Sequence, residues 1–155
     1  MPFADDLLEQ SRHLANRERK RPRQASLRRA ISTAYYALFH LLTTASVSNW
    51  KIVRQRPALA RAFEHRKMNS ACTKTSREQF SNATQMSVQH LKTVANTFIE
   101  LQQHRHTADY DNSRKWARTE VLAQIDSVQA AFDSWNVIAD EQIAEDFLLQ
   151  LLMQR

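Results

Sequence analysis

The chain of 155 residues contains no glycine, one cysteine and three prolines. The missing glycine excludes the glycine-rich loops that cradle phosphates, and it argues against β-sheets, whose tight turns usually need glycine. The single Cys72 excludes an internal disulfide and a thiolate zinc cluster. The sequence has no apolar signal core and no apolar run near the roughly 20 residues that span a bilayer. We therefore expect a cytoplasmic protein that does not contact membranes.

The residues that are present favour helices. Ala, Leu, Gln, Arg and Glu are good helix formers, and 43% hydrophobic residues suffice for a core. The length predicts one domain over residues 1–155. Apolar periodicity predicts helices over the ranges 4–17, 22–46, 58–67 and 83–103. A further helix carries the stripe Val121–Trp135, and the last predicted helix, over 140–153, is either separate from it or continues it after a bend. The predicted fold is all-α: an up-and-down four-helix bundle with a short middle helix and an additional C-terminal helix.

Three stretches break this periodicity. Residues 47–57 resemble a connection, and the polar stretch 68–84 holds the expected flexible loop, within 69–82. The sequence HRHTADYDN, residues 104–112, interrupts the last long pattern, and Asp111 or Asn112 can cap the helix that follows. Pro22 suits the first turn of its helix, where its missing N–H costs nothing.

Charge is divided along the chain. Residues 1–92 carry a net charge of +11 and residues 93–155 carry −5. Opposed halves can fold back on each other or pair in a dimer, and a basic half attracts phosphates. A solvated surface with ordinary charge scatter is the alternative. The strongest local feature is a basic connector opposed only by Glu18, and its basic residues are Arg17, Arg19, Lys20, Arg21 and Arg23.

The helix LRRAISTAYYALFHLL, residues 27–42, raises a specific question because its apolar arc is broad and yet it carries a polar row. The row lies at positions i, i+4, i+7 and i+11, with Ser32 beside it, and comprises Arg29, Thr33, Tyr36 and His40. Phe39 shares this sector, so we expect the row to face another helix or another subunit. Buried polar groups need partners, and Arg105 and Asp109 can supply them. The row is then either a network that fixes helix register or the floor of a ligand pocket.

Two motifs resemble one family. RRAISTAYYALFH is similar to the signature helix of HEPN-domain proteins through Ser32, Ala34, Tyr35, Tyr36, Ala37, Phe39 and His40. RHTADYD resembles the R-x-x-A-D-Y element of a large branch of that family, through Arg105, Ala108, Asp109 and Tyr110. The resemblance implies a helical bundle, commonly a homodimer, linked to RNA or nucleotides. It also implies a toxin–antitoxin or defence setting and, for some members, association with a minimal nucleotidyltransferase.

The resemblance further implies a metal-independent ribonuclease in many members, in which an arginine and a histidine, separated by four to six residues, converge at the dimer interface. Here Asp109 and Tyr110 stand where that histidine is expected, and the histidine after Arg105 is the adjacent His106. Our first hypothesis is therefore a non-catalytic or weakly catalytic HEPN-like module that binds RNA or a nucleotide. Its candidate ligand contacts are Arg29, Ser32, Tyr36, His40, Arg105 and the basic connector.

Two alternatives stay open. One is a ribonuclease toxin that acts at a dimer interface, with candidate catalytic residues Arg105, Asp109, Tyr110 and His40, and with His104 and His106 as further proton-transfer groups. The other is a partner-binding subunit of a nucleotidyltransferase, in which the apolar last helix and the acidic segment 133–146 form the interface. No cofactor is predicted. His104 and His106 form an H-x-H pair without a spaced third ligand, so no metal site is predicted either.

Overall fold

The computed structural model describes residues 2–154, which fold as an all-helical bundle. The described residues form seven α-helices and one 3₁₀ turn, η1: α1 Phe3–Ala15, α2 Gln24–Ser48, η1 Val53–Gln55, α3 Arg56–Arg61, α4 His65–Arg77, α5 Gln85–Tyr110, α6 Arg118–Ile138 and α7 Gln142–Met153. None of these helices combines the length and the apolar character that crossing a bilayer requires.

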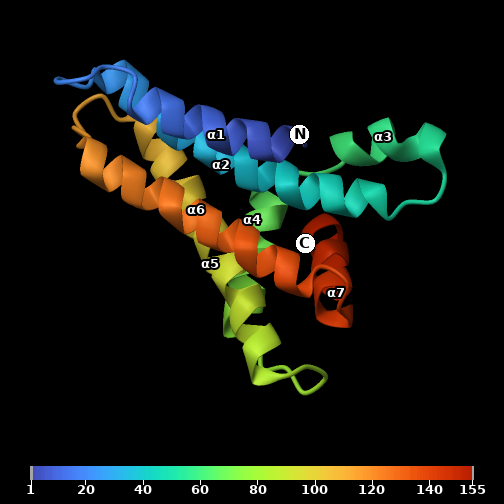
Figure 1. Ribbon diagram of the computed structural model, residues 1–155. Coiled ribbons are helices and arrows are strands. Elements are labelled where there is room, and N and C mark those ends of the chain that lie inside the picture. The colour runs from blue at the N-terminus through green and yellow to red at the C-terminus, as the bar shows by residue number, and fades with distance from the viewer. Residues whose placement is uncertain (1, 155) are drawn as a thin grey trace.

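Helices α1, α2, α5 and α6 alternate in direction (Figure 1). Helix α2 contacts each of the other three, and α6 also contacts α1 and α5. Helix α4 packs between α5 and α7, and α7 also touches α2, α5 and α6. The short helix α3 lies apart from the bundle beside the end of α2 (Figure 1). The prediction of an all-helical bundle with a short middle helix and a C-terminal helix is therefore confirmed.

Helix α2 supplies the centre of the core. Six residues of the apolar arc that periodicity predicts are completely buried: Leu27, Ala30, Ile31, Ala34, Leu38 and Leu42. The other two expected there, Leu41 and Ala45, are only partly buried, while Tyr35 and Ala37 are buried with the arc. These side chains join one contiguous cluster that runs from Ala4 in α1 to Leu151 in α7. Burial of such an apolar surface is the main force that stabilises the bundle. The last helix covers this core, with Ile143, Phe147 and Leu151 buried.

The middle of the chain differs from the prediction. A single helix over 58–67 was expected, but the structure has α3 and α4 separated by a break after Arg61. The predicted flexible stretch within 69–82 is largely α4, and the loop is confined to residues 78–84. The reason lies in Met68, Ala71, Cys72 and Thr75, which follow one helical face and are buried. Small and polar residues concealed this stripe in the sequence.

The second correction concerns HRHTADYDN, which does not interrupt the helix. Helix α5 continues through these residues to Tyr110, so the polar motif forms its last two turns. Asp111 is the C-cap of α5 rather than the N-cap of the next helix, and α6 begins only at Arg118. A smaller correction is that Pro22 precedes α2 instead of forming its first turn. The structure also answers a question that the sequence left open, because a turn separates α6 from α7.

Candidate functional site

Arg105 is the centre of a polar and aromatic cluster between α2 and α5. Its guanidinium carbon lies 5.1 Å from the ring centroid of Tyr35 and 5.8 Å from that of Tyr36. Its Nη1 lies 3.6 Å from Oδ2 of Asp109, one helical turn further along α5. Only 16% of the Arg105 side chain is exposed. Two aromatic rings and a carboxylate thus fix the position of one guanidinium.

Asp109 joins the two helices. Its Oδ1 accepts a hydrogen bond of 2.5 Å from the Ser32 hydroxyl on α2, while its Oδ2 faces Arg105. Hydrogen bonds to a carboxylate are stronger than those between neutral groups. The two motifs that the sequence singled out, one on each helix, therefore meet through the Ser32–Asp109–Arg105 chain. This contact sets the register of α2 against α5.

Tyr35 connects the cluster to helix α4 through a contact with His65. Its hydroxyl lies 2.6 Å from Nδ1 of His65, the first residue of α4, and the His65 ring stacks on Phe39 with a centroid separation of 4.5 Å. Burial raises the pKa of the Tyr35 hydroxyl. Burial lowers the pKa of His65, and the positive charge of Arg105, together with that of His40 whenever it is protonated, lowers it further. Both groups are thus kept neutral, and the His65 tautomer determines which of the two donates the hydrogen bond.

A groove runs beside this cluster along α4 and α5. Its lining is almost entirely polar and consists of Arg66, Asn69, Ser70, Ile99, Gln102, Gln103, Arg105 and His106. Gln102 accepts a hydrogen bond from Asn69 and donates to the His65 carbonyl, so the groove floor is ordered. Guanidinium groups recognise phosphates, and amide side chains can pair with the edges of bases. The groove thus brings together the donors and acceptors that a nucleotide requires.

The predicted polar row of α2 is displaced by one residue. Arg29 is exposed and does not face α5, and the side chain with partners is its neighbour Arg28. Arg28 donates to the carbonyls of Ala108 and Asp111 at 2.9 Å and of Arg114 at 2.7 Å. The residues of α2 that contact α5 through polar groups are therefore Arg28, Ser32 and Tyr35. Their spacing is that of the predicted row, but each lies one position earlier in the sequence, and Tyr36 of the predicted row also lies beside Arg105. Arg28 stabilises the C-terminal end of α5.

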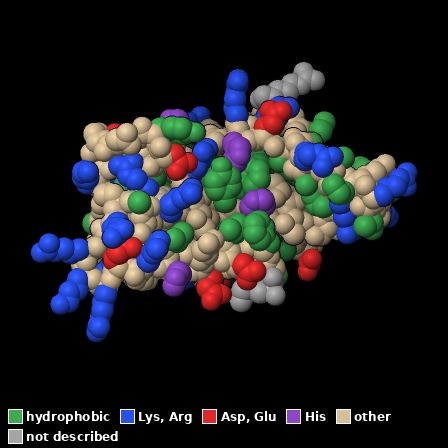
Figure 2. Space-filling view, turned by 90° about the horizontal axis from the view of Figure 1, so that it is seen from above, with side chains coloured by type: hydrophobic (Ala, Val, Ile, Leu, Met, Phe, Trp, Pro, Cys, Tyr) green, Lys and Arg blue, Asp and Glu red, His purple; other side chains and the backbone are tan. Residues whose placement is uncertain are grey.

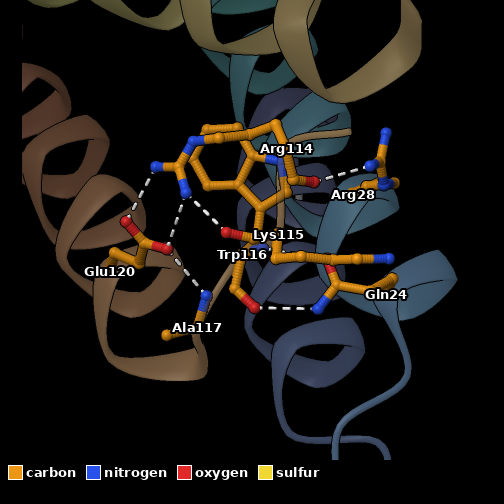
Figure 3. A network of polar contacts seen from close by, with 7 residues as sticks. All are labelled: Gln24, Arg28, Arg114, Lys115, Trp116, Ala117 and Glu120. Carbon is orange, nitrogen blue, oxygen red and sulfur yellow. Dashed lines mark hydrogen bonds and ion pairs between the residues drawn. The ribbon is translucent and has the colours of Figure 1, made fainter. Parts of the chain in front are cut away.

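Arg28 belongs to a second network, which holds the connection between α5 and α6 against the start of α2 (Figure 3). Gln24 donates to the Trp116 carbonyl and accepts from the Trp116 N–H, both at 2.9 Å. Arg114 lies over the Trp116 ring at 4.2 Å and pairs with Glu120 at 2.9 Å. Arg114 lowers the pKa of Glu120. The polar groups of this network bind one another, so we do not place the candidate site there. The candidate site lies further along α2, beyond Ser32, around Arg105.

The other predicted site residues divide into two groups. Tyr36 is half-buried beside Arg105, and His106 lines the groove. His40 is not brought to Arg105 and instead packs edge-on against Phe3, with a centroid separation of 4.9 Å. Tyr110 is 69% exposed, and its ring lies 5.0 Å from that of His106. His104 turns away to Trp116. The structure therefore concentrates the candidates on Arg105, Tyr36 and His106.

The basic connector is a separate feature. Its basic side chains are exposed, while Glu18 accepts hydrogen bonds from the Arg23 N–H and the Ser26 hydroxyl, which lower the pKa of Glu18. Figure 2 shows Lys and Arg gathered at the connector end of this face, whereas hydrophobic and histidine side chains gather near its centre. No hydrogen bond or ion pair within residues 2–154 joins the connector to Arg105.

The sequence analysis did not select three residues that the structure places at the site, namely His65, Arg66 and Asn69. His65 contacts Tyr35, and Asn69 orders the groove. The available signal was the position of His65, one helical turn before Met68, where the buried stripe of α4 begins. Within the described part of the chain, no three His, Cys, Asp or Glu side chains come together in a way that would hold a metal ion.

Comparison with known proteins gives no relative for this chain: no protein family, no curated protein and no solved structure matches it. The function must therefore be argued from the geometry of the cluster and the groove.

The neutral histidines make the fold sensitive to mild acid. In the folded protein, burial lowers the pKa of His40 and of His65. In the unfolded chain both imidazoles take up a proton at about pH 6.5. Below that pH the unfolded state binds more protons, so stability falls as pH falls. We expect the melting temperature to decrease between pH 7 and pH 5.5. The double variant His40→Gln, His65→Gln should lose most of this decrease, and an unchanged decrease would contradict the assignment.

Proposed function

We propose that the protein is a HEPN-like helical module that binds RNA through the groove beside Arg105 and is non-catalytic or weakly catalytic. The observation that carries the proposal is the arrangement of Arg66 and Arg105 on the two walls of a groove whose remaining lining is amide, hydroxyl and imidazole apart from Ile99. Two guanidinium groups are suited to successive phosphates, and the side chains between them are suited to base edges.

The HEPN resemblance supports the same surface. The family-like motifs meet through Ser32, Asp109 and Arg105, and this contact holds Arg105 at the groove. Asp109 accepts from Ser32 and pairs with Arg105, so its carboxylate is occupied by structural partners. Both carboxylate oxygens are engaged within the protein, so neither is free to exchange a proton with a bound substrate. The arrangement therefore favours binding over efficient catalysis.

The net charge of the N-terminal part also supports an anionic ligand. Residues 1–92 carry +11, and the exposed connector adds a long-range attraction for phosphates at one end of the molecule. Because the connector lies away from the groove, we assign it to steering and non-specific contact. It should contribute to the salt dependence of binding more than to the choice of RNA sequence.

The decisive experiment measures binding of a labelled single-stranded RNA by fluorescence anisotropy at several salt concentrations. We expect Arg66→Ala to weaken binding about tenfold, because a charge-assisted phosphate contact is lost, and to reduce the salt slope by about one unit. Arg77→Ala is the matched control: Arg77 is exposed on the same helix α4 but lies outside the groove, and its removal makes the same change in charge.

Two results would contradict the proposal: no detectable RNA binding by the wild type at low salt, or equal loss of affinity in the two arginine variants. Equal loss would indicate that only net charge matters and that the groove is not the site. An uncleaved RNA after prolonged incubation in EDTA is the expected result of a parallel gel assay.

The ribonuclease alternative rests on one observation, namely that His106 and Arg105 line the same groove. If the protein cleaves RNA in EDTA, His106→Ala should abolish cleavage while leaving RNA binding within a few-fold of the wild type. Cleavage that persists in that variant would place the chemistry elsewhere. The nucleotidyltransferase partner and the toxin–antitoxin setting stay predictions from the family resemblance.

A further inference from the structure

A small pocket lies between α4 and α7, beside the loop that joins α4 to α5. Its volume is about 280 Å³, and the residues that line it come from α4, from this loop, from α5 and from α7. None of them lines the groove beside Arg105. What this pocket binds is therefore independent of the proposed function.

The floor of the pocket is apolar. Leu91 of α5 and Ile143 and Phe147 of α7 line it, and each of the three is at most 3% exposed. Phe80, from the loop, also lines the pocket and packs against the same core. A ligand that enters can therefore bury an apolar group against these side chains.

Thr75 adds to this floor a polar group that has no partner in the described protein. The hydroxyls of its neighbours Thr73 and Ser76 donate to carbonyls of the preceding turn, at 2.9 and 2.8 Å. The Thr75 hydroxyl makes no hydrogen bond within residues 2–154, although the residue is only 6% exposed. Its oxygen is not completely enclosed by protein atoms, so a molecule in the pocket can reach it. A buried polar group without a partner costs free energy, and a ligand that bonds this hydroxyl would remove that cost.

Charged side chains of both signs border the pocket. Lys74 lies on α4, Asp146 on α7, and Glu78 at the C-cap of α4. All three are exposed, and none of the ion pairs found within residues 2–154 includes any of them. One cation and two carboxylates thus surround the same apolar floor without pairing with one another.

We propose that this pocket binds a free amino acid with an apolar side chain, such as leucine or phenylalanine. The ammonium of the ligand lies at Asp146 and Glu78, its carboxylate lies at Lys74, and its side chain packs on the apolar floor. The Thr75 hydroxyl donates to the ligand carboxylate. A zwitterion is suited to this lining because it supplies both counter-charges at once.

Other classes of ligand match the lining less well. A polyamine would bring like charge to Lys74, and a fatty-acid anion would bring like charge to Asp146 and Glu78. The volume of 280 Å³ lies below the roughly 300–1,000 Å³ of pockets for drug-sized ligands. The size therefore favours a molecule as small as an amino acid over a nucleotide.

The experiment titrates the isotope-labelled full chain with L-leucine and L-phenylalanine and follows the amide chemical shifts by nuclear magnetic resonance. We expect saturable shifts, concentrated in residues 74–82 and 143–150, with dissociation constants below about 1 mM. Two analogues of leucine are titrated in parallel: isocaproate lacks the ammonium, and isoamylamine lacks the carboxylate. Each should bind at least tenfold more weakly than leucine, because one charge-assisted contact is lost.

Two variants assign the charged contacts to residues. Asp146→Asn should weaken leucine binding about tenfold and leave isocaproate binding unchanged, since isocaproate has no ammonium. Lys74→Gln should weaken leucine binding in the same way and leave isoamylamine binding unchanged, since isoamylamine has no carboxylate. The matched controls are Glu145→Gln and Arg77→Gln, which make the same charge changes at exposed positions of the same two helices, outside the pocket. Both controls should bind leucine as the wild type does.

Thr75→Val separates ligand binding from folding. The substitution removes a hydroxyl that has no partner within the described protein, so the melting temperature of the free protein should not fall. Leucine binding should nevertheless weaken several-fold. A variant that melts earlier and still binds leucine as tightly as the wild type would show that the hydroxyl serves the fold and not the ligand.

Three results would overturn the proposal. The first is the absence of saturable shifts with either amino acid up to about 10 mM, well above the expected dissociation constant. The second is isocaproate or isoamylamine binding as tightly as leucine, which would show that the pocket does not select a zwitterion. The third is an equal loss of leucine affinity in Asp146→Asn and Glu145→Gln, which would show that only net charge matters.

Discussion

Replacing Arg28 with alanine is expected to lower the free energy of unfolding by about 2–3 kcal/mol. The guanidinium of Arg28 donates to three carbonyls, those of Ala108, Asp111 and Arg114, and thereby joins α2 to the end of α5 and to the connection that follows. The last carbonyls of a helix have no intrahelical partner, and a cation near them also meets the negative end of the helix dipole. Hydrogen bonds from a charged donor contribute about 1.5–3 kcal/mol where burial shields them, and partial exposure keeps the sum of three bonds low.

Arg29 provides the matched control. It is the next residue on the same helix, it carries the same side chain, and it is exposed. Arg29→Ala should change the free energy of unfolding by less than about 0.5 kcal/mol, as is usual for a surface substitution. Urea denaturation followed by circular dichroism measures both values. Similar losses in the two variants would show that Arg28 acts through charge alone and that its carbonyl contacts do not stabilise the fold.

This pair of arginines also shows what periodicity could predict. Most of the apolar arc of α2 was predicted correctly, because six of its residues repeat at helical spacing and are buried: Leu27, Ala30, Ile31, Ala34, Leu38 and Leu42. The neighbouring polar row was assigned to Arg29, Thr33, Tyr36 and His40, whereas the residues with partners on the other helices are Arg28, Ser32 and Tyr35. The two rows differ by 100° of rotation. Spacing identifies such rows, but only the position of α5 decides which edge of the apolar arc faces it.

The helix boundaries that were wrong have a common cause. Both α4 and the end of α5 were read as irregular because polar residues dominate them. In the structure these polar groups have partners, as Arg105 and Asp109 do on α5 and Asn69 does on α4. Apolar content therefore underestimates a helix whose polar side chains are satisfied by neighbouring helices. The buried small residues Ala71 and Ala108 give too weak a periodic signal to compensate.

The candidate site was predictable in part. Ser32, Tyr36, Arg105 and Asp109 were chosen from two motifs separated by some 70 residues, and the structure brings them together. The groove itself was not predicted, because its second wall is α4, of which only the first three residues lay in the predicted helix 58–67. Arg66 and Asn69 enter the site only through that wall. Long-range packing, rather than local pattern, thus determines what Arg105 faces.

Tyr35→Ala is expected to have the largest effect of any substitution proposed here, a loss of about 3–5 kcal/mol in the free energy of unfolding. Tyr35 is completely buried, and its ring packs near Phe98 and under the Arg105 guanidinium. Truncating a large buried aromatic side chain removes its apolar contacts and leaves a cavity. It also deprives His65 of the hydroxyl that forms a hydrogen bond with Nδ1. A loss of this size approaches the whole stability of a small domain.

Two further variants separate the contributions of the ring and the hydroxyl. Tyr35→Phe keeps the ring and should cost about 1–3 kcal/mol, because a half-buried His65 nitrogen is left unpaired. Tyr36→Ala should cost clearly less than Tyr35→Ala, since Tyr36 is only half-buried and its neighbour fills the core. Equal losses for Tyr35→Ala and Tyr36→Ala in urea denaturation would contradict this division. The two adjacent tyrosines therefore have different roles: Tyr35 holds α2, α4 and α5 together, while Tyr36 remains accessible beside Arg105.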